Sequence, residues 1–84
     1  MSESPIMVYG TNWCGDCRRT KKFLRKHAVA FTWINTDKDK EAERYVRKVN
    51  DGKRIVPTIV FDDGSILVEP TNKQLGEKLG IAEA

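Results

Sequence analysis

Short apolar runs and helix-spaced apolar positions alternate along the chain. Residues 6–9 are a mostly apolar run closed by Gly10, which fits a buried strand that leads into a turn. Residues 16–28 contain neither glycine nor proline, and core-type side chains recur there at spacings of three and four, which predicts a helix. Residues 30–35 alternate in residue types suited to a pleated surface. We therefore expect a strand, a helix and a second strand.

A second helix is expected after this strand. Thr36 and Asp37 are N-cap candidates, because their side-chain oxygens can accept hydrogen bonds from the first amides of a helix. Apolar positions then follow at i, i+3, i+4 and i+7, namely Ala42, Tyr45, Val46 and Val49. Residues 50–52, Asn-Asp-Gly, are turn-forming and predict the end of this helix.

A hairpin and a short last helix complete the pattern. Residues 58–61 and 65–68 are typical of two strands around a tight turn. Thr71 and Gln74 match a capping box, and the helix that it opens should run to about Gly80. The order is strand, helix, strand, helix, strand, strand, helix. This order predicts an α/β fold with a four-stranded mixed sheet and helices on both faces.

The length of 84 residues leaves room for a single domain, residues 1–84. A bridge between Cys14 and Cys17 would close so short a loop that it would contribute only about 2 kcal/mol before strain. The cysteines are therefore expected to do chemistry, while apolar packing holds the fold. We expect the core to comprise Phe23, Leu24, Phe31, Tyr45, Val46, Val49, Ile59, Phe61 and Leu75.

The charge balance points away from nucleic acid and membranes. The formal net charge is only +3, which does not favour a nucleic-acid binder. Six cations do gather on the first predicted helix: Arg18, Arg19, Lys21, Lys22, Arg25 and Lys26. They predict a solvated face, or a surface that recruits an acidic protein substrate. No apolar run approaches the roughly 18 residues of a membrane-spanning helix, and we expect a soluble, cytoplasmic protein.

Cys14 and Cys17 lie between a predicted strand and a predicted helix, which is the context of a redox-active C-x-x-C pair. At a spacing of three on one helix the two sulfurs can approach bonding distance. The free amides at the start of the helix stabilise a thiolate at Cys14. Cys17, one turn further on the apolar face, should be buried and protonated. We assign Cys14 as the nucleophile and Cys17 as the resolving thiol.

A zinc site is the main alternative for paired cysteines. A closed zinc site needs about four ligands, and the chain adds only His27 at the far end of the helix, so we expect no metal held within one chain. His27 is expected to pack on the helix. Asp16 stands between the cysteines, where it either opposes the thiolate or favours the helix dipole. Both interpretations of Asp16 remain open.

These residues together resemble a known family. The WCGDC motif of residues 13–17, the basic helix, and the Arg-Ile-Val-Pro-Thr element of residues 54–58 ahead of a hairpin resemble the glutaredoxin branch of the thioredoxin superfamily. Within that branch the chain looks most like mycoredoxin-type glutaredoxins. The resemblance implies a thioredoxin-like fold and thiol-disulfide oxidoreductase activity. It also implies a cis peptide between Val56 and Pro57, facing the cysteines and exposing the Val56 backbone to an extended substrate.

The resemblance also implies a small-molecule site. Arg54 occupies the place of a residue that binds one glutathione carboxylate, and Thr71 resembles the position that holds the other. Trp13 and Asp16 complete the expected substrate-binding residues. Glutathione or another low-molecular-weight thiol would be a co-substrate, with no cofactor bound in the protein. This chain has Thr11 and Asn12 where the family often has a lysine, so the electron donor stays open.

Several partners follow from this interpretation. The expected substrates are proteins that carry a disulfide or a mixed disulfide with a small thiol, and the expected reductant is a thiol or a flavoprotein reductase such as thioredoxin reductase. We expect a monomer. A dimer that holds an iron-sulfur cluster through Cys14 and external thiols is the non-enzymatic alternative. A phosphate-binding module built on the basic helix is a third.

Overall fold

Four short strands form one mixed sheet in the order β2-β1-β3-β4 in the computed structural model, which describes residues 6–81. β1 (Met7–Gly10) is central and pairs in parallel with β2 (Thr32–Asn35). On its other side it pairs antiparallel with β3 (Thr58–Val60), which pairs antiparallel with β4 (Ile66–Val68). The expected mixed sheet is confirmed.

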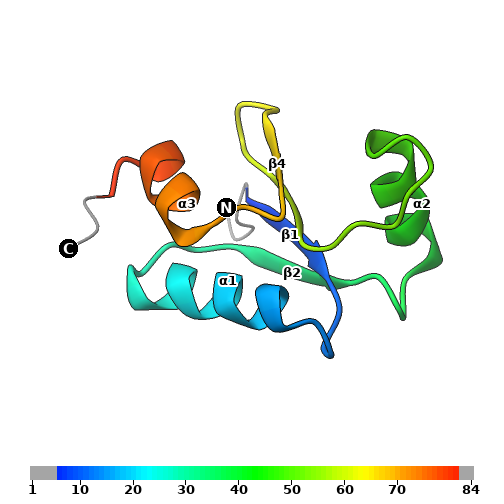
Figure 1. Cartoon of the computed structure of the whole chain (residues 1–84), viewed down its shortest axis with the longest axis horizontal. Coiled ribbons are helices and arrows are strands. Elements are labelled where there is room, and N and C mark those ends of the chain that lie inside the picture. Colours follow the sequence, from blue (N-terminus) through cyan, green and yellow to red (C-terminus); the bar gives the residue numbers. More distant parts are fainter. Residues whose placement is uncertain (1–5, 82–84) are drawn as a thin grey trace.

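Three helices join and cover these strands (Figure 1). α1 (Gly15–Lys26) makes the crossover from β1 to β2, and α2 (Lys40–Val49) connects β2 to β3. α3 (Asn72–Leu79) follows the hairpin and lies beside α1 in Figure 1, whereas α2 stands apart at the other side of the sheet. The element order is the one that the sequence predicts.

The alternation of side chains along β1 and β3 separates the two faces of the sheet. Val8 and Ile59 are register partners and are completely buried in the cluster that α1 and α3 cover. Their neighbours point to α2: the ring of Tyr9 lies 5.2 Å from the ring of Tyr45. On the same face the Asn50 side chain donates to the Thr58 hydroxyl at 3.2 Å. Helices therefore cover both faces, as expected.

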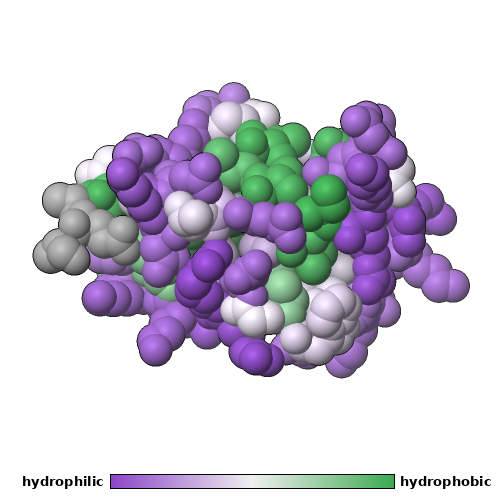
Figure 2. Space-filling view, viewed as in Figure 1, coloured by the Kyte–Doolittle hydropathy of each residue, from purple (hydrophilic) through white to green (hydrophobic). Residues whose placement is uncertain are grey.

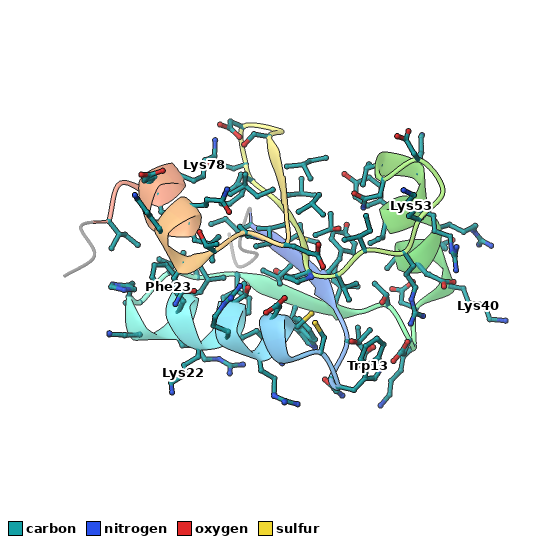
Figure 3. The ribbon with its side chains drawn as sticks, viewed as in Figure 1. Trp13, Lys22, Phe23, Lys40, Lys53 and Lys78 are labelled. Carbon is teal, nitrogen blue, oxygen red and sulfur yellow. The ribbon has the colours of Figure 1, made fainter. Side chains whose placement is uncertain are left out.

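The core is concentrated on the face that carries α1 and α3. Its buried members are Ile6, Val8, Phe23, Leu24, Ile59, Phe61 and Leu75. Figure 3 shows the labelled Phe23 between α1 and α3. Each of these side chains contributes about 1.5–3 kcal/mol when fully buried.

Part of the expected core is wrong. Tyr45 and Val49 on α2 are half-buried, although Val46 is fully buried. Phe31 is half-buried too, but it packs against the core cluster as expected. The physical reason lies in α2, which covers its face incompletely and leaves a hollow that is lined in part by Tyr9, Ile34 and Tyr45. Figure 2 shows apolar atoms at the surface between the β4 hairpin and α2.

The expected start of α2 is also wrong. Its N-cap is Asp39, whose Oδ1 accepts from the Ala42 amide at 3.0 Å. Thr36 is instead buried, and its hydroxyl donates to the Gly10 carbonyl at 3.3 Å. The Asp37 carboxylate binds partners near the cysteines, as described below. Both residues thus serve long-range contacts that local capping rules do not register.

The other helix ends agree more closely with the sequence. α1 ends at Lys26, and Ala28 adopts a left-handed conformation with φ of 56°. The capping box at α3 is confirmed, with Thr71 and Gln74 bonded reciprocally. Gly80 ends α3 in a left-handed conformation with φ of 72°, which glycine adopts without steric cost.

Candidate redox site

The sulfur of Cys14 lies at the start of α1. Cys14 is the N-cap, with φ −86° and ψ 120°, and its Sγ accepts a hydrogen bond from the Cys17 amide at 3.3 Å. The cysteine thus takes the place that a serine or aspartate usually holds. Amide donors and the positive end of the helix dipole both favour negative charge on this sulfur. Cys14 is half-buried, so the sulfur can meet a substrate.

Cys17 lies behind Cys14 and is completely buried. Burial is the main cause that raises the pKa of its thiol to about 12; the backbone hydrogen bond from Thr11 acts in the lowering direction, and the hydrogen bond with Cys14 acts in the raising direction. The sulfur packs against Gly10, where an added Cβ would lie 2.5 Å from it. Both cysteines are free thiols in this structure. Cys17 therefore has the burial expected of it from the sequence.

The peptide between Val56 and Pro57 is cis, as the family resemblance implies. Pro57 is buried next to the start of β3, and the Cys14 sulfur donates a long hydrogen bond of 3.9 Å to the Val56 carbonyl. Chain segments 42 residues apart thus meet at the Cys14 sulfur. The Val56 backbone and the Cys14 sulfur form one continuous edge of the site.

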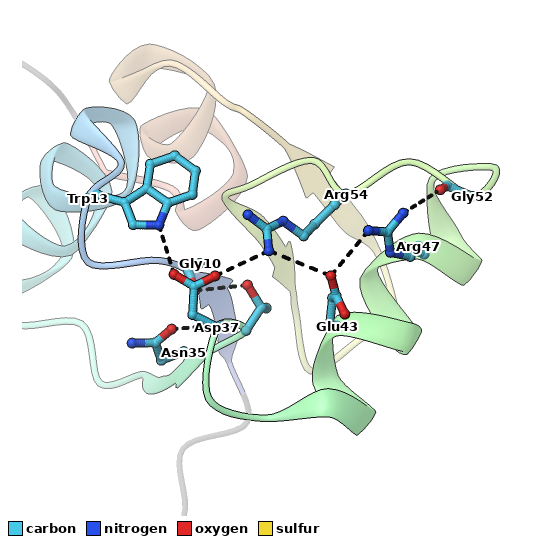
Figure 4. Close-up of polar contacts among 9 residues, drawn as sticks. Gly10, Trp13, Asn35, Asp37, Glu43, Arg47, Gly52 and Arg54 are labelled. Atoms are coloured by element: carbon cyan, nitrogen blue, oxygen red, sulfur yellow. Dashed lines mark hydrogen bonds and ion pairs between the residues drawn. The ribbon is translucent and has the colours of Figure 1, made fainter.

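Trp13 and Arg54 meet at one carboxylate beside the cysteines (Figure 4). The Trp13 indole donates from Nε1 to Asp37 Oδ2 at 2.7 Å, and Arg54 donates from Nη1 to Asp37 Oδ1 at 3.2 Å. The same Nη1 lies 3.6 Å from Glu43 Oε2, which also accepts from Arg47 at 3.2 Å. Two carboxylates and two guanidiniums therefore form one network of zero net charge.

Sequence reasoning missed the roles of Asp37 and Glu43. It assigned Asp37 to a helix cap and gave Glu43 no role. Asp37 lies 24 residues from Trp13 and 17 from Arg54, so no local spacing reveals these pairs. The sequence does contain one indication of these pairs, the four carboxylates between residues 37 and 43. They follow β2 at the edge of the sheet, where they can meet cations from other segments.

The remaining predicted site residues lie at the rim. Asp16 is exposed, and its carboxylate forms an ion pair with Arg19 at 3.5 Å. Arg19 also donates to the Pro70 carbonyl at 2.7 Å, which ties α1 to the segment before α3. Thr71 is exposed, and its hydroxyl and amide are both bonded to Gln74. Arg19 thus connects the Asp16 end of α1 to the residue next to Thr71.

The basic helix face is divided between packing and solvent. Lys21 lies with its ammonium 3.8 Å from the centroid of the Trp33 ring, and Arg25 lies 5.7 Å from that of Phe31. Arg18 and Lys22 are exposed, and Figure 3 shows the labelled Lys22 pointing away from the body of the molecule. Two of the six cations of this surface, Lys21 and Arg25, therefore support the fold through cation–π contacts.

Within residues 6–81, no three His, Cys, Asp or Glu side chains gather as metal ligands would. His27 packs its ring 4.5 Å from that of Phe23, which fits the packing role expected of it. No helix in the same part of the chain is long and apolar enough to cross a membrane.

A buried thiol behind a helix-capping thiol, on a four-stranded mixed sheet with three helices, defines a thioredoxin-fold protein of the dithiol type. The family model for glutaredoxin matches residues 6–66. The chain belongs to the glutaredoxin family, whose members in general carry out thiol-disulfide exchange. The resemblance seen in the sequence is thereby confirmed.

Relatives and solved structures agree with this assignment. Mycoredoxin 1 of Corynebacterium glutamicum is 37% identical over 76 residues, which cover 90% of this chain and 94% of that protein. The glutaredoxin-like protein NrdH of Lactococcus lactis subsp. cremoris is 41% identical over 59 residues, covering 69% of this chain and 78% of that protein. The crystal structure of a Methanosarcina mazei glutaredoxin matches with a TM-score of 0.77 at 29% identity, over 93% of this chain and 80% of that one.

Proposed function

We propose that this protein is a dithiol thiol-disulfide oxidoreductase in which Cys14 attacks and Cys17 resolves. One observation carries the proposal: the half-buried Cys14 sulfur accepts an amide at the helix start, whereas Cys17 is completely buried behind it. A sulfur at the positive end of a helix is stabilised as the attacking thiolate. A buried sulfur meets no external disulfide, so its role is internal.

The reaction runs in two exchange steps. The Cys14 thiolate attacks one sulfur of a substrate disulfide, forms a mixed disulfide and releases the other substrate sulfur as a thiolate. Cys17 then loses its proton and attacks the Cys14 sulfur, which releases the second substrate thiolate and leaves a Cys14–Cys17 disulfide. Two electrons pass from the protein to the substrate. An external reductant returns the protein to its dithiol form.

The order of these steps follows from the environment of Cys17. While Cys14 is free, its hydrogen bond and its charge both help to raise the pKa of the Cys17 thiol. Both contributions disappear when Cys14 becomes part of a mixed disulfide. The pKa of Cys17 then falls, and the leaving substrate thiolate can accept its proton. Burial, the main cause of the raised pKa, remains, but Cys17 is deprotonated more easily once it has a disulfide to attack.

The substrate lies along the edge made by Val56 and Pro57. We place an extended substrate segment against the Val56 backbone, whose carbonyl is 3.9 Å from the Cys14 sulfur. The Trp13 indole, 62% exposed, provides an apolar surface at the same edge. Asp16, Arg54 and Thr71 form the rim. Protein disulfides and mixed disulfides are the substrate class that this open edge fits.

The fold unit that performs this chemistry comprises residues 1–84 and acts as a monomer without a bound cofactor. Its reductant is a flavoprotein reductase of the thioredoxin reductase type or a low-molecular-weight thiol. We place the reaction in the cytoplasm, where reducing systems keep such cysteine pairs cycling. Supplying the oxidised protein with NADPH and either thioredoxin reductase or glutathione with its reductase identifies the donor.

Single-cysteine variants test the proposal. We expect Cys14→Ser to abolish reduction of a protein disulfide such as that of insulin. Cys17→Ser should instead accumulate a mixed disulfide at Cys14, visible by mass spectrometry as the added mass of the substrate. Ser65→Ala, remote from the cysteines on the hairpin, is the control and should turn over normally. Full activity of Cys14→Ser would refute the proposal.

A further inference from the structure

The positions expected to bind the two carboxylates of glutathione are both occupied by groups of the chain itself. Arg54 binds Asp37 at 3.2 Å and lies 3.6 Å from Glu43. These side chains are only about one third exposed, at 30%, 35% and 28%, so water screens them less than it would on an open surface. An incoming carboxylate meets a guanidinium whose charge is already balanced.

The second expected position is satisfied in the same way. The Thr71 amide donates to Gln74 Oε1 at 2.8 Å, and the Thr71 hydroxyl accepts from the Gln74 amide at 3.1 Å. A ligand carboxylate could bind the Thr71 amide only by displacing the Gln74 side chain from the capping box. The two subsites lie on different elements and are closed by different chemistry. Because both subsites are nevertheless bound by groups of the chain, we infer that glutathione is disfavoured at this site.

We propose that Asp37 is a specificity-determining residue that selects against dicarboxylate thiols of the glutathione class. This proposal rests on the proposed function, and it concerns which small thiols the same site accepts. Both Asp37 and Glu43 contact Arg54 through the same nitrogen, Nη1. Asp37 and Glu43 therefore oppose a ligand carboxylate mainly by balancing the charge of the guanidinium, and not by occupying each of its nitrogen donors.

Asp37 also positions the Trp13 side chain, which offers an apolar surface beside Arg54. It holds the Trp13 indole through Nε1 at 2.7 Å, and the Arg54 guanidinium lies 5.8 Å from the centre of the Trp13 ring. A single carboxylate thereby positions an exposed aromatic side chain next to Cys14 and balances the charge of Arg54. An exposed, rigid indole is a common anchor in protein–protein contacts. The same residue favours an apolar segment and disfavours an anion.

Binding of S-methylglutathione, whose blocked sulfur cannot react, tests the proposal by NMR titration of the reduced protein. We expect Asp37→Asn to bind it about fivefold more tightly than wild type, because one opposing charge near Arg54 is removed. Asp62→Asn changes the net charge equally at the exposed hairpin turn and should leave binding unchanged. In the double variant Asp37→Asn, Arg54→Gln the gain should disappear.

Two results would overturn this role. One is unchanged affinity of Asp37→Asn relative to wild type and Asp62→Asn. The other is a gain that persists when Arg54 is replaced, since Asp37 would then not act through Arg54. The titration measures binding without any exchange step. Its failure is therefore distinguishable from failure of the proposed function, which the cysteine variants measure by turnover.

Discussion

The amide of Cys17 donates a hydrogen bond to the sulfur of Cys14 at 3.3 Å. In turn, Cys14 contributes to the raised pKa of the Cys17 thiol. Cys14 gains a donor that favours its thiolate. Cys17 is buried behind Cys14, and this burial is the main cause that raises the pKa of Cys17 to about 12. A spacing of three residues across a helix start is sufficient for this division of roles.

The buried Cys17 thiol should make the reduced protein less stable in alkali. The pKa of Cys17 in the folded protein, about 12, lies above the ordinary thiol pKa of 9.0. The protonated thiol therefore contributes fully to stability at neutral pH, and this contribution is lost as the pH rises from the ordinary pKa through the folded-state pKa. We expect the free energy of unfolding of wild type to fall more steeply above about pH 9 than that of Cys17→Ala. Urea titrations along a pH series measure the two slopes, and parallel slopes would contradict the assignment.

Gly10 should tolerate no side chain. A Cβ there would lie 2.5 Å from the Cys17 sulfur and 2.7 Å from the Trp33 ring. Gly10→Ala is expected to destabilise the fold by roughly 1–3 kcal/mol through overpacking. Gly15→Ala is the matched control: a Cβ meets nothing within 4 Å at that first helical position, and we expect a gain of about 0.4–1 kcal/mol. Urea denaturation distinguishes them, and equal effects would be inconsistent with this packing.

The capping box at α3 should contribute measurably to the free energy of unfolding. Thr71→Ala removes the hydroxyl that accepts from the Gln74 amide at 3.1 Å, and should cost about 1 kcal/mol of folding free energy. Lys73→Ala, exposed on the same helix, should change stability little. Chemical denaturation of both variants measures the difference. A loss in Lys73→Ala as large as that in Thr71→Ala would argue against a capping role.

The hairpin is tied to α3 by a carboxylate that should matter in acid. The Lys78 ammonium, 2.7 Å away, and then Ser65 hold the pKa of Asp63 well below its usual range. Its contribution is present above the ordinary carboxyl pKa of about 4 and is lost as the pH falls. Asp63→Asn should therefore lose less thermal stability than wild type on acidification from about pH 5 to pH 2. Identical acid profiles would show that the contact is not formed in solution.

Most of the fold could be predicted because it depends on local patterns. The spacing of Cys17, Phe23 and Leu24 predicts the buried face of α1, and Thr71 with Gln74 predicts the start of α3. The half-burial of Tyr45 could not be predicted, since periodicity shows which side of α2 faces the sheet but not how completely the sheet is covered.

Some features of the site could likewise be predicted from the sequence, and others could not. The cysteine pair is a local motif, and the cis peptide before Pro57 was available through the family resemblance. The pairing of Asp37 with Trp13 and Arg54 depends on how three separate segments meet in space. The sequence assigned Asp37 to the cap of the nearest helix, because its short carboxylate suits a cap and sequence spacing shows only local partners.

Alkylation of the reduced wild-type protein tests the central assignment most directly. At about pH 8 the Cys17 thiol, whose pKa burial raises to about 12, stays protonated, and its sulfur is completely buried. We predict that a limiting amount of iodoacetamide labels Cys14 and leaves Cys17 unmodified, as peptide mass spectrometry would show. Preferential labelling of Cys17, or equal labelling of both cysteines, would contradict the account.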